Sequence, residues 1–102
     1  MGIEDRGRPL FDLGSLVATP AALEVMQEHG VYGPALIKRH VTGDYGDVCD
    51  EDRAANEEAL ESGARIMSVY TVDEVRLWII TDAVIDEEGH RQATTILLPE
   101  DY

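Results

Sequence analysis

Apolar residues recur at helical spacing in the first half of the chain. In the segment 20–28 they lie at positions i, i+3 and i+4 of one helix face, and a histidine extends this stripe at i+7. The stripe consists of Ala22, Val25, Met26 and His29. Thr19 is a good N-cap, Pro20 fits the first helical position, and Gly30 is typical of a helix end. The pattern therefore predicts a first helix from residue 20 to about residue 28.

Two more helices are predicted before residue 63. The second runs from Pro34 to about Val41 and is stopped by the glycine at position 43. Its inner side consists of Leu36, Ile37, His40 and Val41. The third begins at Asp47 or Asp50, with acidic residues in its first turn, where the helix dipole favours negative charge, and it ends at about residue 62. Its narrow packing stripe consists of Ala55, Ala59 and Leu60.

After Gly63 the apolar period changes from helical to extended. Residues 65–72 and 75–82 are β-branched and aromatic, and only Asp73-Glu74 separates them, which predicts a hairpin. This turn lacks the glycine or asparagine that a type I′ turn prefers. Residues 92–98 are a third predicted strand, ended by a proline.

The order of these elements predicts an α+β fold. N-terminal helices pack on one face of a C-terminal three-stranded antiparallel sheet. Residues 10–18 are also apolar and form either a short strand or a packed extended arm. A length of 102 residues fits a single domain, 1–102, whose polar, glycine-containing start, residues 1–9, is expected to be flexible.

The net charge restricts the partners. Twenty-one acidic residues against eight basic ones give a formal charge of −13, which repels nucleic acid and anionic membranes. Direct binding to either is therefore not expected, and a protein partner with a basic surface, or with a basic groove that normally holds nucleic acid, is favoured. An acidic surface also keeps small proteins soluble without any partner.

The compartment is expected to be the cytoplasm. The single cysteine, Cys49, excludes an internal disulfide and suits a reducing environment. No apolar run that could act as a signal peptide occurs between Met1 and Pro9, and the longest apolar stretch, residues 77–80, is far too short to span a membrane.

The densest group of polar residues follows the second helix. His40, Asp44, Tyr45 and Asp47 are a candidate polar site, since an imidazole next to carboxylates can bind a metal or transfer protons. Their spacing matches neither helical zinc motifs nor the calcium-loop pattern. Helix ending, turn formation and capping also explain these residues, so we assign no catalytic residue, metal ligand or cofactor.

The third predicted helix carries a dense acidic run. Six carboxylates between Asp50 and Glu61 occupy roughly 17 Å of helix, or about one charge per 3 Å, compared with about 3.4 Å between phosphates of one nucleic-acid strand. Four of them share a face and are the candidate partner-binding residues: Asp50, Glu57, Glu58 and Glu61. The run suggests mimicry of a nucleic-acid backbone.

Several motifs cover nearly the whole chain from Phe11 onward. They are Thr19-Pro20-x-Ala22-Leu23, Arg39-His40-x-x-Gly43-Asp44-Tyr45-Gly46-Asp47, Glu51-Asp52-x-x-x-Asn56-Glu57, Gly63-x-Arg65, Ser68-x-Tyr70, Trp78-Ile79-Ile80-Thr81 and Thr94-Thr95-Ile96-Leu97-Leu98-Pro99-Glu100-Asp101-Tyr102. With them the chain resembles a widespread family of small bacterial proteins of plasmids, phages and integrated elements. Some members carry a restriction–modification subunit label, although this chain has no methyltransferase motif. The chain departs from its relatives at Tyr45, where they usually have tryptophan, and at Asp73-Glu74, where they commonly have glycine.

Three functions follow from these observations. The resemblance implies a mobile genetic element, where small acidic proteins often block a defence or regulatory complex. The first hypothesis is therefore a non-enzymatic accessory protein that binds a protein partner, in its sharpest form an anti-CRISPR or anti-restriction inhibitor. The second is a small hydrolase or metal-dependent enzyme centred on His40, Asp44 and Asp47. The third is an antitoxin-like regulatory partner, which differs from the first only in its target.

Overall fold

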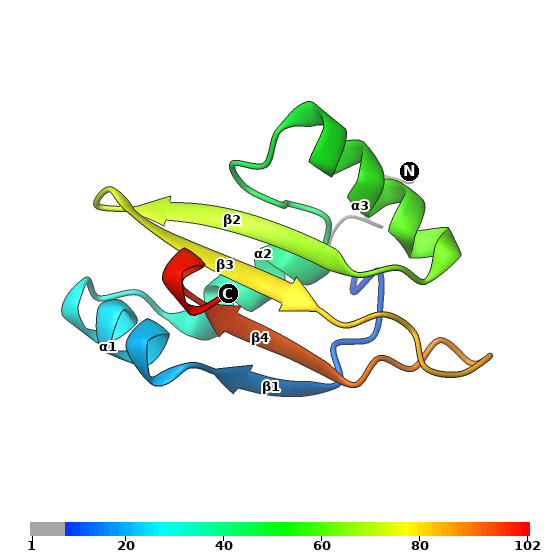
Figure 1. The fold of residues 1–102 in the computed structure, drawn as a ribbon, viewed down its shortest axis with the longest axis horizontal. Helices are drawn as coiled ribbons and strands as arrows, with labels where there is room; N and C mark the ends of the chain where they lie inside the picture. The colour runs from blue at the N-terminus through cyan, green and yellow to red at the C-terminus, as the bar shows by residue number, and fades with distance from the viewer. Residues whose placement is uncertain (1–7) are drawn as a thin grey trace.

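The computed structural model describes residues 8–102, and most of the predicted flexible start lies outside this range. Three helices follow a short first strand, and three further strands and a 3-10 turn complete the chain (Figure 1). The elements are β1 (Ser15–Ala18), α1 (Pro20–Glu28), α2 (Gly33–Val41), α3 (Asp50–Ser62), β2 (Ile66–Val72), β3 (Val75–Thr81), β4 (Ala93–Leu97) and η2 (Pro99–Asp101). The predicted α+β class is confirmed.

The sheet has four strands in the order β1-β4-β3-β2. The predicted antiparallel pairs β2–β3 and β3–β4 are present. The prediction of three strands was incomplete, because residues 15–18 add a fourth strand that pairs in parallel with β4. The sheet is therefore mixed, and its two edges are formed by β1 and β2.

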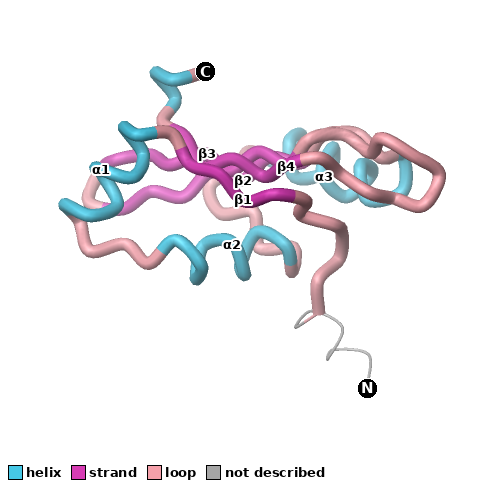
Figure 2. The backbone as a smooth tube through the Cα atoms, turned by 90° about the horizontal axis from the view of Figure 1, so that it is seen from below, coloured by secondary structure: helices cyan, strands magenta, loops and turns pink. Residues whose placement is uncertain are grey.

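The helices occupy different places around the sheet. In Figure 2 the sheet is seen nearly edge-on, with α2 below it and the C-terminal turn above it. On the upper side the Tyr102 ring packs edge-to-face on Trp78, with ring centroids 5.5 Å apart. α1 packs against β4, and α3 lies beyond the β2 edge (Figure 1). No helix within residues 8–102 is both long and apolar enough to cross a membrane.

Two apolar clusters form the core. The first joins α1 and α2 to the sheet and consists of Ala22, Met26, Leu36, Ile37, Tyr70, Leu77, Ile79 and Ile96. The second lies between α3 and β2 and consists of Tyr45, Val48, Ala59, Ile66 and Val69. The four inner residues predicted for α2 are all buried, and Thr19 caps α1 by accepting a hydrogen bond from the Ala22 amide at 3.1 Å.

The predicted packing stripe of α3 was wrong in part. Ala59 is buried, but Ala55 is exposed and Asn56 takes a buried place instead. The Asn56 side chain donates to the Met67 carbonyl at 2.8 Å and accepts from the Met67 amide at 3.1 Å. Asn56 thus replaces a neighbouring strand at the β2 edge, and small apolar residues alone could not satisfy these backbone groups.

The β2–β3 turn has left-handed geometry without glycine. Asp73 and Glu74 have φ values of 51° and 69°. This is the backbone that a two-residue type I′ hairpin requires, so the geometry of the turn follows the strands although the sequence lacks the preferred residues. The Asp73 carboxylate also lies 3.0 Å from Nδ1 of His29, which connects the turn to the end of α1.

Candidate functional site

The candidate polar segment forms a tight corner between α2 and the β2 edge. The Asp44 amide donates to the Arg39 carbonyl at 2.9 Å as the chain leaves the helix. The backbone then pairs with Val69, whose amide donates to the Tyr45 carbonyl at 3.0 Å, and the Asp47 amide donates to the Val69 carbonyl at 2.7 Å. The corner therefore acts as a short additional strand on β2.

Gly46 allows this pairing. Its φ is +74°, and a Cβ atom placed on it would lie 2.1 Å from the Val69 carbonyl oxygen. An L-amino-acid side chain therefore has neither a relaxed backbone nor space at this position. The glycine is explained by the close approach of two backbones.

His40 is a fully buried core residue. It projects from α2 toward the sheet, and its Nδ1 lies 2.6 Å from the Ser68 hydroxyl and its Nε2 lies 2.8 Å from Thr81 Oγ1. Thr81 Oγ1 in turn lies 2.7 Å from Thr94 Oγ1, which donates to the Leu13 carbonyl at 2.7 Å. These hydroxyls connect one imidazole to three neighbouring strands.

The direction of these hydrogen bonds determines the histidine tautomer. Thr94 donates its only hydroxyl proton to the Leu13 carbonyl, so it accepts a hydrogen bond from the Thr81 hydroxyl, and Thr81 accepts a hydrogen bond from His40 Nε2–H. His40 Nδ1 is then the unprotonated nitrogen and accepts from Ser68. Burial, together with repulsion by Arg91, lowers the pKa of His40 to about 4, so the ring is neutral at physiological pH.

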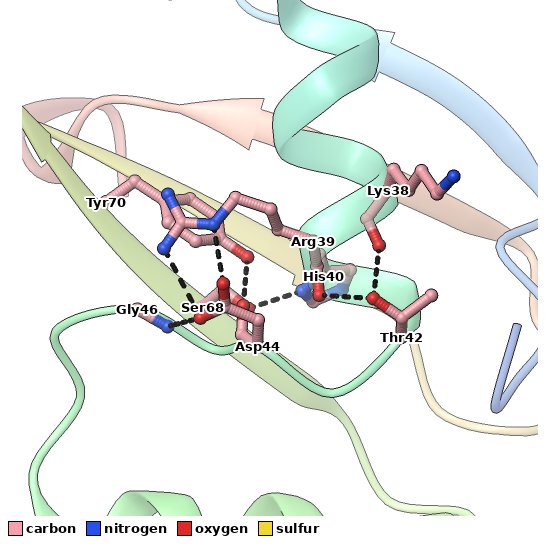
Figure 3. Close-up of polar contacts among 8 residues, drawn as sticks. All are labelled: Lys38, Arg39, His40, Thr42, Asp44, Gly46, Ser68 and Tyr70. Atoms are coloured by element: carbon pink, nitrogen blue, oxygen red, sulfur yellow. Dashed lines mark hydrogen bonds and ion pairs between the residues drawn. The ribbon is translucent and has the colours of Figure 1, made fainter. Parts of the chain in front are cut away.

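Asp44 forms an ion pair at the surface of the corner. Its carboxylate accepts from Arg39 Nε at 2.7 Å, and this hydrogen bond holds the pKa of Asp44 below its ordinary value. The Arg39 guanidinium lies 4.5 Å from the centre of the Tyr70 ring, and the Tyr70 hydroxyl donates to the Asp44 carbonyl at 2.6 Å (Figure 3). Burial raises the pKa of Tyr70 to about 12, so this hydroxyl keeps its proton.

The four residues of the candidate polar site do not converge. Tyr45 is fully buried with its ring 6.4 Å from that of His40, whereas Asp44 pairs with Arg39 and the Asp47 side chain is exposed. A general acid or base must reach the proton that it transfers. The buried, hydrogen-bonded His40 has no such access, so the geometry gives no support to the hydrolase hypothesis.

One small carboxylate–histidine group lies elsewhere, in the connection between β3 and β4. Ligand atoms of Asp86, Glu88 and His90 come within 4.8 Å of one another, and all three side chains are exposed. The Asp86 carboxylate accepts from the Glu88 and His90 amides at 3.0 Å each and lies 2.7 Å from His90 Nδ1. This hydrogen bond raises the pKa of His90 and lowers that of Asp86. Turn formation accounts for this group.

The four candidate partner-binding residues lie where the sequence placed them. Asp50, Glu57, Glu58 and Glu61 are exposed on α3. At about 100° per residue, three of them fall within an arc of about 40°, and Glu58 lies about 60° further round. The buried residues of α3, Asn56 and Ala59, lie roughly opposite. No ion pair involves these four carboxylates within residues 8–102, so their charge is presented to solvent.

Sequence reasoning missed the role of Arg91. Its buried guanidinium donates to the Ala64, Asp82 and Ala59 carbonyls at 2.7, 3.0 and 3.2 Å and lies 5.6 Å from the centre of the Phe11 ring. Through Ala59, near the end of α3, it connects the acidic helix to the sheet. No local pattern reveals this role, since arginine is most often a surface residue.

Of the predicted site residues, the four carboxylates of α3 are exposed together on one helix, whereas His40 and Tyr45 are buried. Comparison with protein-family models, with curated proteins and with solved structures finds no match to this chain.

Proposed function

We propose that this chain is a non-enzymatic interaction protein that presents the acidic face of α3 to a basic surface of a protein partner. The observation that carries this proposal is the set of four exposed carboxylates without an ion-pair partner in residues 8–102: Asp50, Glu57, Glu58 and Glu61. Such a charged face accelerates association with an oppositely charged surface and selects against acidic partners. Because the net charge is −13, the long-range field acts in the same direction.

A firmly attached helix supports this function. The first turn of α3 contains Asp50, Glu51 and Asp52, whose charges favour the helix start, and Gly63 ends the helix with φ 84°. Asn56 and Arg91 attach it to the sheet from its buried side. The helix backbone that carries the carboxylates is therefore fixed before a partner arrives, which lowers the entropy cost of binding.

In its sharpest form, the proposal is that the acidic face occupies a basic groove that normally holds nucleic acid. The resemblance to proteins of mobile elements favours a defence complex as the target. The four carboxylates are not evenly spaced, since Asp50 and Glu57 are separated by about 10 Å of helix. We therefore propose competition through charge rather than a copy of the regular phosphate spacing.

The test compares two quadruple variants of equal charge. One neutralises the α3 face (D50N, E57Q, E58Q, E61Q), and the other neutralises exposed carboxylates elsewhere (E24Q, E28Q, E87Q, E100Q). Each changes the formal charge from −13 to −13 + 4 = −9. Both are used as bait in a lysate of the native host, at low and then at high salt.

A partner that the wild type and the second variant retain, and that the α3 variant and high salt release, supports the proposal. Addition of a DNA duplex should also displace that partner if its basic groove normally holds nucleic acid. Equal retention by both variants would show that the α3 face is not the contact surface.

A further inference from the structure

The β1 edge of the sheet is open. The Ser15 and Thr19 amides donate to the Gln92 and Ile96 carbonyls at 3.0 Å each, so the intervening Leu16 and Ala18 turn their N–H and C=O groups away from β4. Figure 2 views the molecule from this side, and within residues 8–102 no further strand lies along β1. The strand also lacks the charged residues, proline or bulge that usually protect an edge.

The surface around this edge is apolar. Leu16, Val17 and Leu23 are 58%, 48% and 55% exposed. A groove of about 780 Å³ lies between β1, α1 and α2, and Gln27 is the one polar side chain among its lining residues. Contiguous apolar surface next to unpaired backbone groups is typical of a contact with another chain.

The distribution of charge allows two copies to associate at the β1 edge. No charged side chain lines the groove, although the chain carries a formal charge of −13. The acidic helix α3 lies beyond the opposite edge of the sheet (Figure 1). The three spacings between β1 and β2 amount to about 14 Å, which exceeds the Debye length of about 8 Å at physiological salt. Two copies that meet at β1 therefore keep their acidic helices apart.

We propose that two copies of this chain associate through antiparallel pairing of their β1 strands, with a two-fold axis at Val17. The outward-facing residues are two positions apart, so Leu16 of one copy lies opposite Ala18 of the other, and each of the two such pairs exchanges two backbone hydrogen bonds. Val17 faces Val17 of the second copy in the close, non-hydrogen-bonded position. The contact is self-complementary and closes after two copies.

The dimer has a continuous eight-stranded sheet. Its outer edges are the two β2 strands, each covered by its own corner and by α3. The exposed parts of Leu16 and Val17 become buried at the new interface. This inference is independent of the partner proposed for α3, because the two surfaces lie at opposite edges of the sheet.

The test places opposite charges at the two-fold axis. The wild type should sediment with about twice the mass of the 11.3 kDa chain. V17D and V17K should each sediment as monomers, because like charges then face each other across the axis. An equimolar mixture of V17D and V17K should regain the dimer mass, since the facing charges are then opposite.

The matched controls are I85D and I85K, which alter an exposed apolar residue in the β3–β4 connection, outside the groove. They should retain the dimer mass, and circular dichroism should show that all four variants are folded. A wild type that stays monomeric over a concentration series overturns the proposal, as does a dimer that persists in V17D or V17K. Failure of the mixture to dimerise overturns the register centred on Val17.

Discussion

The two edges of the sheet differ in whether their backbone groups have hydrogen-bond partners. At the β2 edge, Val69 pairs with the backbone of Tyr45 and Asp47, and Met67 pairs with the Asn56 side chain. At the β1 edge, the backbone groups of Leu16 and Ala18 point away from β4, and an apolar groove lies beside them. An edge strand needs partners for its backbone groups. The chain supplies them at β2, and at β1 we propose that a second copy does so.

This comparison explains the polar corner better than catalysis does. Gly46 permits the backbone contact with β2, Asp44 and Arg39 hold the corner, and His40 fastens α2 to the sheet beneath it. The corner and Asn56 together cover the edge beside which the acidic helix lies. The residues that first suggested an active site thus position the surface that we propose for partner binding.

The largest expected effect is at Gly46. G46A places a Cβ atom against the Val69 carbonyl at positive φ, and overpacking together with backbone strain should lower the free energy of unfolding by about 3 kcal/mol. The control is G30A, which has φ +67° and no atom within 4 Å of the added Cβ, and which should cost only about 1 kcal/mol. Urea unfolding of both variants measures the difference. Equal losses would mean that the corner does not pack closely on β2.

Acid should lower the free energy of unfolding through His40, which lies beneath the same corner. Its pKa is lowered to about 4 in the folded chain from an ordinary 6.5, so the unfolded chain binds this proton first as the pH falls. The stabilising contribution is complete above pH 6.5 and is lost progressively between pH 6.5 and pH 4. Between pH 6.5 and pH 5 the loss should be about 2 kcal/mol.

The measurement is urea unfolding over this pH range for the wild type and for H40Q. All other titratable groups are the same in both proteins, so the difference between the two curves of unfolding free energy against pH isolates His40. H40Q should be less stable than the wild type at pH 7, but its stability should depend less on pH from 6.5 to 5. Parallel curves would contradict the buried, neutral histidine.

Removal of the side-chain amide of Asn56 should also expose the β2 edge. N56A loses both hydrogen bonds to Met67 and leaves partly buried backbone groups without this partner, so the free energy of unfolding should fall by about 2 kcal/mol. The neighbouring A55S is the control, because Ala55 is exposed and its substitution should change stability by less than about 0.5 kcal/mol. Hydrogen exchange at the Met67 amide should accelerate in N56A, and unchanged exchange would show that the side chain does not protect this edge.

The smallest expected effect on folding is at the open edge. V17K alters a half-exposed residue of β1 and should change the free energy of unfolding of the monomer by less than about 1 kcal/mol. Chemical unfolding at a protein concentration below that of dimer formation measures this quantity. A loss similar to that of G46A would mean that β1 stabilises the monomer as strongly as the covered edge does, and the contrast between the edges would then fail.

Local sequence signals determined the elements of this protein. Thr19-Pro20 begins α1, the apolar stripe of α2 places His40 on its inner side, and the two β-rich segments around Asp73-Glu74 form the hairpin. The four acidic residues of α3 were also correctly placed at the surface. These features depend on residues within one or two helical turns or within one strand, which is the range over which periodicity and capping act.

The tertiary structure alone decided which distant groups meet. β1 pairs with β4, and the partners of His40 on β2 and β3 lie 28 and 41 residues away in sequence. Asn56 and Arg91 look like surface residues in the sequence, yet both become buried because unpaired backbone groups of β2 and near the end of α3 need donors and acceptors. Such demands arise only when the elements pack. The same packing left one edge of the sheet covered and the other open.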